Sequence, residues 1–246
     1  SDGVTTKLIE DTGVITYIDE IMDELTNESY QPSPLLRITI PKGNGESRLI
    51  NIPTVKDKIV QKALTLILNP IFETIFYDLS MAFRPNRSQL DAVENVAGFI
   101  KDDLTHIIQT DIEQCFNNLN RQLVLDNMDF IHDEKFKQLI KSFFCPQIVD
   151  KKGDMIPVAP DIAQGTVIAP ILSNIALHTL DNSFITNYNS EQCRMVRYAD
   201  DLLFLMKYPE TDFINEIDSM LNDIGLKRNT DKSKIINLRR KEPLKY

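Results

Sequence analysis

The chain has 246 residues, 42% of them hydrophobic, with a formal net charge of -9 at pH 7 and three widely spaced cysteines. It is long and apolar enough to bury a core, either as one large unit or as two closely packed subdomains. The odd number and wide spacing of the cysteines indicate neither a disulfide framework nor a zinc knuckle. No apolar run reaches membrane-spanning length and the first residues lack signal-peptide character, so we expect a cytoplasmic protein without a membrane partner.

The first hundred residues predict a helix, a hairpin and two further helices. Apolar residues recur at helical spacing over residues 14–28, which favours an amphipathic helix. Two apolar runs, residues 35–41 and 48–52, flank a Lys-Gly-Asn-Gly turn and predict a β-hairpin, because glycine permits positive φ. Helices are then expected over residues 55–76, with a bend at the internal proline, and over residues 88–101.

The rest of the chain alternates between strand and helix patterns. In chain order, the expected elements are a strand at 106–112, helices to about residue 144, a hairpin turn at 149–154, a helix at 167–188, a hairpin centred on 198–201, a helix at 213–224 and a basic strand at 227–238. This mixture of helices and antiparallel strands indicates an α+β architecture.

Three aspartates carry the strongest chemical signal. Asp200 and Asp201 fall at the expected tip of a hairpin, with strand-forming residues on both sides. Asp111 interrupts an apolar strand, where an uncompensated carboxylate is costly. Carboxylates on separate strands bind hard cations such as Mg²⁺, and two-metal phosphoryl transfer needs such a clamp. The alternatives are a solvated turn for the pair and a helix cap for Asp111.

With these residues the chain resembles reverse transcriptases, and within them the group II intron-encoded (maturase) class. The matching blocks are, in order, Tyr30–Pro34, Ile40–Lys42, Arg48–Thr54, Ala82–Ser88, Asp111 with Phe116, Gln164–Asn174, Tyr198–Asp201, and Gly225-Leu226 with Asn229 and Lys232. A single block is ambiguous, but the ordered series over nearly the whole chain is specific. One departure is Ile162-Ala163, where group II relatives have a Gly-x-Pro approach, and it leaves the loop geometry there open.

The resemblance implies a right-hand polymerase fold. Fingers would occupy residues 1–104, and a catalytic palm, with an antiparallel sheet packed on helices, would occupy residues 105–246. In the family a helical thumb would follow, so the thumb is expected to be absent from this chain.

The resemblance also assigns the aspartates to nucleotidyl transfer. Asp111, Asp200 and Asp201 would hold two Mg²⁺ ions, for which Mn²⁺ could substitute. Lys232 would donate a proton to the departing pyrophosphate or neutralise its charge. Its basic neighbours leave open a plain basic surface instead.

Five residues are expected to bind the incoming nucleotide. The ring of Phe116 would lie under the sugar and exclude a ribose 2′-hydroxyl, whereas its alternative is a core side chain. Gln164 and Gly165 would lie beside the nucleotide and template, where glycine permits close backbone approach, unless they form an ordinary turn before a helix. Lys42 and Arg48 flank the hairpin turn and could contact triphosphate oxygens, or simply keep an exposed hairpin soluble.

The basic residues are unevenly distributed, which reconciles the acidic chain with a nucleic-acid partner. Residues 1–30 hold one lysine against eight acids, residues 31–90 hold eight Lys/Arg against four acids, and residues 227–246 hold eight against two. Arg84 and Arg87 would contact template or primer phosphates. Salt bridges to acidic neighbours are the alternative for both.

The leading functional prediction is RNA-directed DNA synthesis by a group II intron maturase in the bacterial cytoplasm. Its partners would be an RNA template, intron RNA, a DNA primer and dNTPs, and the sequence leaves open whether it forms a homodimer. An RNA-binding splicing scaffold with secondary polymerase activity, and a CRISPR- or defence-associated reverse transcriptase of group II descent, are the alternatives. An RNA-templated RNA polymerase shares the Asp pair, but Phe116 argues against it.

Overall fold

The computed structural model describes residues 3–41, 43, 45, 47–157, 161–209 and 212–239, and it divides into two compact units. The first unit comprises residues 1–68 and 130–169, and the second comprises residues 69–129 and 170–246. The chain therefore passes through each unit twice. The boundary expected between residues 104 and 105 falls inside the second unit, and the assignment of fingers and palm stays a prediction.

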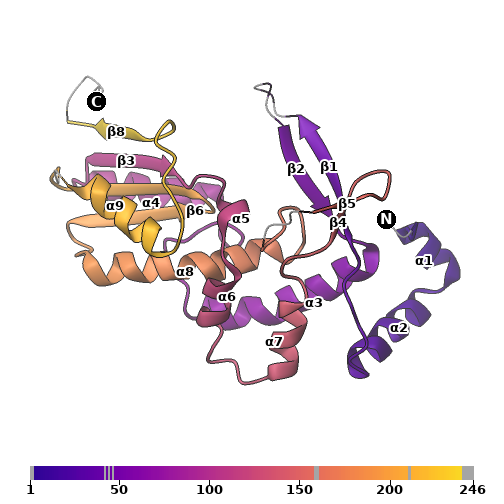
Figure 1. Ribbon diagram of the computed structural model, residues 1–246. Helices are drawn as coiled ribbons and strands as arrows, with labels where there is room; N and C mark the ends of the chain where they lie inside the picture. The colour runs from indigo at the N-terminus through magenta and orange to yellow at the C-terminus, as the bar shows by residue number, and fades with distance from the viewer. Residues whose placement is uncertain are drawn as a thin grey trace. The chain divides into compact units, whose positions relative to one another are not determined.

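The first unit is built on a small mixed sheet (Figure 1). Its elements are α1 (Thr6–Thr12), α2 (Val14–Thr26), β1 (Leu35–Pro41), β2 (Ser47–Ile52), most of α3 (Val55–Glu73), α7 (Glu134–Lys141), β4 (Ile148–Val149) and β5 (Met155–Ile156). The strand order is β2-β1-β4-β5. β1 pairs antiparallel with β2 and parallel with β4. Leu35, Ile148 and Ala163 form its buried apolar centre.

The start of α3 is fixed by a buried carboxylate. Asp57 accepts hydrogen bonds from the Tyr30 hydroxyl at 2.6 Å, the Thr54 hydroxyl at 2.7 Å and the Ser33 backbone N–H at 3.2 Å. Burial, followed by the bond to Asp57, raises the pKa of Tyr30 far above its ordinary value. These contacts tie the segment between α2 and β1 to the first turn of α3.

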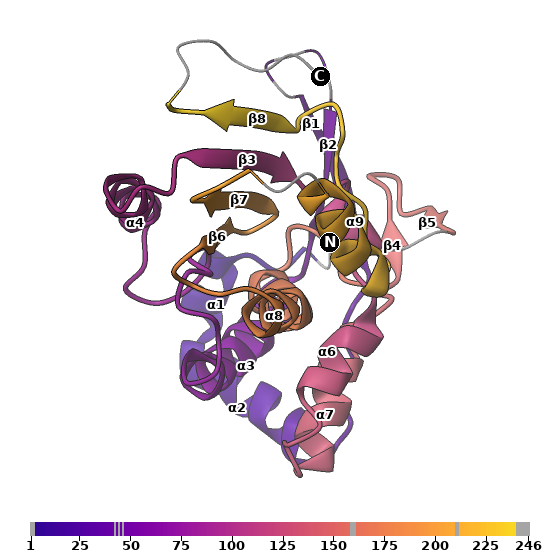
Figure 2. The ribbon, with the colours of Figure 1, turned by 90° about the vertical axis from the view of Figure 1, so that its left-hand side faces the viewer.

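The second unit holds an antiparallel sheet with strand order β6-β7-β3-β8. Its elements are the last turn of α3, α4 (Gln89–Lys101), β3 (His106–Asp111), α5 (Cys115–Asn118), α6 (Arg121–Asn127), nearly all of α8 (Ala169–Asn187), β6 (Cys193–Tyr198), β7 (Asp201–Met206), α9 (Phe213–Asp223) and β8 (Lys234–Asn237). α4 and α9 lie on opposite sides of this sheet (Figure 2). The sheet is therefore covered on both faces.

Side-chain alternation along the strands explains this layering. Ile107, Val196 and Leu205 pack on the α4 side. Phe204, on the other side, contacts the rings of Phe184 on α8 and Phe213 on α9 at centroid distances of 5.7 and 5.4 Å. The α+β architecture and the antiparallel sheet expected from the sequence are confirmed.

One predicted strand was too long. The basic stretch 227–238 forms a strand only over Lys234–Asn237. Before it, the Ser233 backbone N–H donates to the Thr230 carbonyl at 3.2 Å, and the Ser233 hydroxyl donates to the Asn229 carbonyl at 2.7 Å. The segment therefore forms a turn, because short polar side chains there bond to the local backbone. Among the described residues, no helix combines the length and the apolar character needed to cross a membrane.

Candidate active site

The hairpin between β6 and β7 presents two adjacent carboxylates at its tip. Tyr198 and Asp201 are the last register pair, so Ala199 and Asp200 form the turn. Ala199 has φ +58°, in the left-handed region that costs an L-residue about 1–2 kcal/mol. Backbone of this kind persists only where its surroundings hold it in place.

The third carboxylate lies on the neighbouring strand. Asp111, at the end of β3, is the direct register partner of Asp201 on β7. The Ile112 backbone N–H donates to the Asp200 carbonyl at 3.1 Å, which ties the turn to the end of β3. Asp111 is buried, Asp200 half-buried and Asp201 exposed. The structure thus gathers at one end of the sheet the three aspartates that the sequence singled out.

Their mutual repulsion shows in the protonation of Asp201. Its pKa is raised above the ordinary value by partial burial first, and then by the negative charges of Asp200 and Asp111. Lys232 acts in the opposite direction. A cation near these carboxylates would relieve the same repulsion.

Lys232 is brought to this cluster by the turn that follows α9. The Asn229 backbone N–H donates to the Asp111 carbonyl at 2.7 Å, and the Asn229 side chain accepts from the Lys232 backbone N–H at 3.3 Å. The Lys232 ammonium group forms an ion pair with Asp111 Oδ2. This contact raises the pKa of Lys232. The lysine is therefore part of the cluster and does more than contribute to a basic surface.

The cluster fits a hard cation in the chemistry of its donors. Carboxylate oxygens are the ligands that Mg²⁺ prefers, and Asp111 and Asp201 face each other across two paired strands. Within the described part of the chain, however, no three His, Cys, Asp or Glu side chains are arranged to hold a metal ion together. Because Lys232 binds one oxygen of Asp111, a cation at this site would have to share the carboxylate with Lys232 or displace the lysine.

Phe116 lies on the short helix α5, directly after the end of β3. Gln114 has φ +46° and turns the chain into this helix. Cys115 points inward, and its pKa is raised to about 12 by burial, followed by the charge of Asp200. Phe116 is half-buried. Its ring is therefore not enclosed in the core, although its role in sugar selection stays a prediction.

A cleft of about 290 Å³ opens beside Asp201 in the second unit. Gln89 and Val93 of α4 line one wall, and Gln109, Tyr198 and Leu203 of the sheet line the other. Asp201 itself belongs to the lining, together with apolar side chains such as Val96 and Val196.

The Gln164-Gly165 loop packs against β2 within the first unit. The Gln164 carbonyl accepts from the Asn51 backbone N–H at 3.0 Å and from the Asn51 side-chain amide at 3.1 Å. Gly165 has φ +101°, and a Cβ there would lie 2.7 Å from Ile50 Cγ2 and 2.8 Å from the Asn51 carbonyl oxygen. This close approach is made to β2. The predicted approach of Gly165 to nucleotide and template stays a prediction.

Asn51 is a supporting residue that sequence reasoning did not single out. It is buried on β2, and Arg37 Nε donates to its side-chain oxygen at 3.0 Å. Asparagine is depleted in strands, so its position between two isoleucines was the sequence feature that could have indicated a special role for Asn51. Arg48 lies exposed on β2 opposite Ile40, and Lys42 lies outside the described residues.

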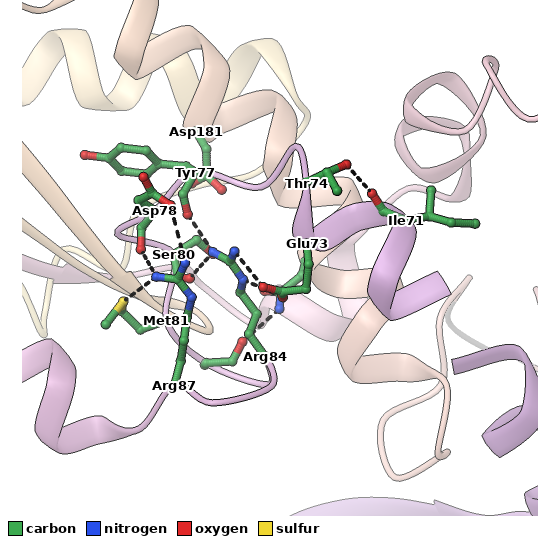
Figure 3. Close-up of polar contacts among 12 residues, drawn as sticks. Ile71, Glu73, Thr74, Tyr77, Asp78, Ser80, Met81, Arg84, Arg87 and Asp181 are labelled. Atoms are coloured by element: carbon green, nitrogen blue, oxygen red, sulfur yellow. Dashed lines mark hydrogen bonds and ion pairs between the residues drawn. The ribbon is translucent and has the colours of Figure 1, made fainter. Parts of the chain in front are cut away.

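Arg84 and Arg87 differ in their availability (Figure 3). Arg84 is 5% exposed and donates to both carboxylate oxygens of Glu73, at 2.8 and 3.0 Å, and to the Tyr77 and Ser80 carbonyls, each at 2.7 Å. This corrects the predicted phosphate contact: the guanidinium of Arg84 is committed to the fold, as the salt-bridge alternative required.

Arg87 is less enclosed. Its side chain retains 26% exposure beside Asp78, which it contacts through the carbonyl and the carboxylate. A phosphate contact for Arg87 therefore stays a prediction.

Comparison with known proteins places the chain among polymerases. The family described as reverse transcriptase (RNA-dependent DNA polymerase) matches residues 40–246. Protein YkfC of Escherichia coli is 32% identical over 80% of this chain and 52% of its own length. The group II intron-encoded protein LtrA of Lactococcus lactis is 32% identical over 67% of this chain and 27% of its own. The chain thus spans about half or less of the curated relatives described here.

The fold agrees with this placement. An apo telomerase from Candida tropicalis, truncated from its C-terminal domain, matches 92% of this chain and 56% of its own chain, with a TM-score of 0.63 and 17% sequence identity. At that identity the likeness concerns the fold alone. Because the family match covers most of the chain, including the three clustered aspartates, the chain belongs to the reverse transcriptase family.

Proposed function

We propose that this protein is an RNA-directed DNA polymerase whose catalytic centre is formed by Asp111, Asp200 and Asp201. The observation that carries the proposal is the register pairing of Asp111 with Asp201, with Asp200 in the adjoining turn. Two bound Mg²⁺ ions, or Mn²⁺ in their place, would activate the attacking 3′-hydroxyl of the primer and stabilise the leaving pyrophosphate. The three carboxylates would hold those ions, and their crowding favours cation binding.

Lys232 would contribute a positive charge to this centre. It is mostly exposed, yet its ammonium group pairs with Asp111. Its ammonium group is charged at neutral pH, as for any lysine, and the contact with Asp111 holds that charge in place. It would neutralise the pyrophosphate as that group departs, or protonate it.

The nucleotide-binding roles expected from the sequence are part of this proposal, each for its own residue. Phe116 would lie under the sugar of the incoming nucleotide, and its half-buried ring is accessible for that role. Gln164 and Gly165 would contact the nucleotide or template, while Lys42 and Arg48 would contact the triphosphate. The support for Gln164 and Gly165 is that Asn51 holds their loop in place through two hydrogen bonds to the Gln164 carbonyl.

Within the family, we assign the protein to the group II intron maturases, which would also bind intron RNA and assist splicing and retrohoming. The support is the match to the intron-encoded protein LtrA. One alternative is a splicing scaffold in which polymerisation is secondary. Unlike the proposed maturase, it would bind RNA and assist splicing but would not extend primers efficiently. A defence-associated reverse transcriptase would extend primers without assisting splicing.

Primer extension tests the proposal directly. The purified protein is given an annealed DNA primer on an RNA template, with dNTPs or NTPs, and with Mg²⁺, Mn²⁺ or EDTA. We expect dNTP addition that depends on the divalent cation. Addition of NTPs in preference to dNTPs would instead indicate an RNA polymerase, and RNA binding with no addition would indicate the scaffold.

A further inference from the structure

Arg197 is fully buried two residues before the turn formed by Ala199 and Asp200. It lies on β6, and both it and Asp181 on α8 have 0% side-chain exposure. The two side chains form a bidentate pair, with Nε to Oδ1 at 2.8 Å and Nη2 to Oδ2 at 2.5 Å. Asp181 is labelled in Figure 3, on the helix behind the segment around Ser80. Buried ion pairs are weak stabilisers compared with apolar packing, so the pair calls for another explanation.

The remaining nitrogen of Arg197 reaches the catalytic turn. Nη1 donates to the Asn174 side-chain oxygen at 3.0 Å and to the Ala199 carbonyl at 3.3 Å. Asn174 is itself buried and held, because its amide donates to the Ala82 carbonyl at 2.8 Å. The guanidinium is therefore anchored on two sides, and its third contact is the residue with φ +58°.

The backbone of Arg197 is fixed as firmly as its side chain. Its N–H donates to the Leu79 carbonyl at 2.9 Å, and its carbonyl accepts from the Met81 N–H at 2.8 Å. Arg84, through Tyr77 and Ser80, holds the segment that makes these bonds. Arg197 thus joins α8, this segment and the turn that carries Asp200 and Asp201.

We propose that Arg197 is a positioning residue that fixes the left-handed turn and thereby sets the placement of the Asp200 and Asp201 carboxylates. Arg197 does not touch substrate. Its planar fork allows three anchors at once, which the compact ammonium group of lysine cannot reproduce. Asp181 and Asn174 orient the fork. This inference rests on the proposed function, because it concerns the same carboxylates.

The main variant is Arg197→Lys, which keeps the charge for Asp181 but removes the fork. Asn174→Ala is a second variant, which removes one anchor and leaves the ion pair in place. Ile217→Ala is the matched control, since Ile217 is a fully buried apolar residue on α9 whose loss lowers stability without touching the turn. Asp200→Asn shows which part of the Mn²⁺ binding occurs at the carboxylate cluster, because it removes one of the carboxylates.

Two measurements separate positioning from stability. Mn²⁺ binding is followed by calorimetric titration below the melting temperature of each variant, and single-nucleotide addition is followed as a function of Mg²⁺. For Arg197→Lys we expect Mn²⁺ affinity to fall by about 10- to 100-fold, as for other residues that support metal ligands. The Mg²⁺ concentration for half-maximal rate should rise in parallel, while the KM for dNTP at saturating Mg²⁺ stays near that of the parent. Ile217→Ala should melt earlier with its cation affinity unchanged.

Equal cation affinity in Arg197→Lys and Ile217→Ala would overturn the inference. If Arg197→Lys does not fold, Asn174→Ala decides: reduced Mn²⁺ affinity supports positioning, and parental affinity refutes it. The titration needs no polymerase activity. A parent that binds Mn²⁺ through Asp200 but adds no nucleotide would therefore refute the proposed function and still test Arg197.

Discussion

Asp111 on β3 and Asp201 on β7 are direct register partners at the same end of an antiparallel sheet. Side chains on directly opposed positions of neighbouring strands lie on the same face, about 4.5–5.5 Å apart at Cβ. Two like charges so placed repel each other. The pKa of Asp201 is raised by partial burial first, and then by the charges of Asp200 and Asp111. The arrangement is unfavourable for stability alone, which is typical of catalytic carboxylates.

Asp111→Asn and Asp200→Asn should each abolish nucleotide addition, because each removes a charge from the proposed metal clamp. The fold and RNA binding should persist. Primer extension in Mg²⁺ and circular dichroism measure the two properties. Asp129→Asn is the control, since Asp129 is an exposed aspartate of the same unit. Parental extension rates in either active-site variant would show that the site is assigned wrongly.

Asp201→Asn should raise the melting temperature in EDTA at neutral pH. The folded pKa of Asp201 lies above its ordinary value of 3.8. The folded protein therefore holds this proton more tightly than the unfolded chain, and the charged form destabilises the fold above the folded pKa. As pH falls through the folded pKa, the penalty disappears.

The melting temperatures of parent and Asp201→Asn should thus converge in acid. Each kcal/mol relieved corresponds to about 2–4 °C in a chain of this size. A constant difference across the pH series, or a less stable variant at neutral pH, would contradict the assignment.

Phe116→Ala should weaken discrimination between dNTPs and NTPs more than it slows dNTP addition. The reason is that the half-buried ring is the proposed barrier to a ribose 2′-hydroxyl. The rival is a packing ring, whose loss destabilises a core by about 3–5 kcal/mol. Incorporation ratios and melting temperature are measured together. Lower stability with unchanged sugar preference would favour the packing role.

Gly165→Ala should disrupt the Gln164-Gly165 loop and reduce nucleotide addition. Its Cβ would clash with Ile50 and with the Asn51 backbone, which cannot move aside as a flexible side-chain end could. Gly225→Ala is the matched control, because Gly225 also has positive φ, +73°, but nothing lies within 4 Å of its added Cβ. Strain alone should cost about 1–2 kcal/mol at either site.

Equal losses of stability and activity in the two glycine variants would mean that the packing against β2 is unimportant. Nucleotide addition should instead fall selectively in Gly165→Ala.

RNA affinity should fall steeply with salt, despite the acidic chain, because local basic side chains release counterions from phosphates. Arg87→Ala should reduce the salt slope by about one unit if Arg87 contacts a phosphate. Arg84→Ala should instead lower the melting temperature, because it removes the donor to the Glu73 carboxylate and to the Ser80 carbonyl, and one of two donors to the Tyr77 carbonyl. Filter binding across a salt series and thermal melts distinguish the two. An unchanged slope in Arg87→Ala removes that residue from the RNA surface.

The local pattern of the sequence was sufficient to predict most helices and strands. The hairpin at residues 35–52 and the long helices follow from apolar spacing and from turn residues, which are local signals. The aspartate cluster was predictable because each member interrupts or ends an apolar strand. The parallel pairing of β1 with β4 was not predictable, because it joins segments about a hundred residues apart that carry no local signature of their pairing.

Residue roles that depend on partners were less accessible to sequence reasoning. Arg84 lies in a matching block and Arg197 directly precedes one, and only the positions of Glu73 and Asp181 show that each arginine is buried and paired. Likewise, nothing near Lys232 in sequence indicates Asp111 as its partner. Long-range ion pairs set these roles, and local propensity does not encode them.

The bridge between Ser80 and Arg197 also protects a sheet edge. β6 is the outermost strand of its sheet, and an exposed strand edge invites pairing with another chain. The backbone N–H of Arg197 that faces outward donates to Leu79, and its carbonyl accepts from Met81. The Tyr77 hydroxyl is hydrogen-bonded to the Met195 backbone. The half of β6 nearest the turn is therefore closed to edge-to-edge association with another chain.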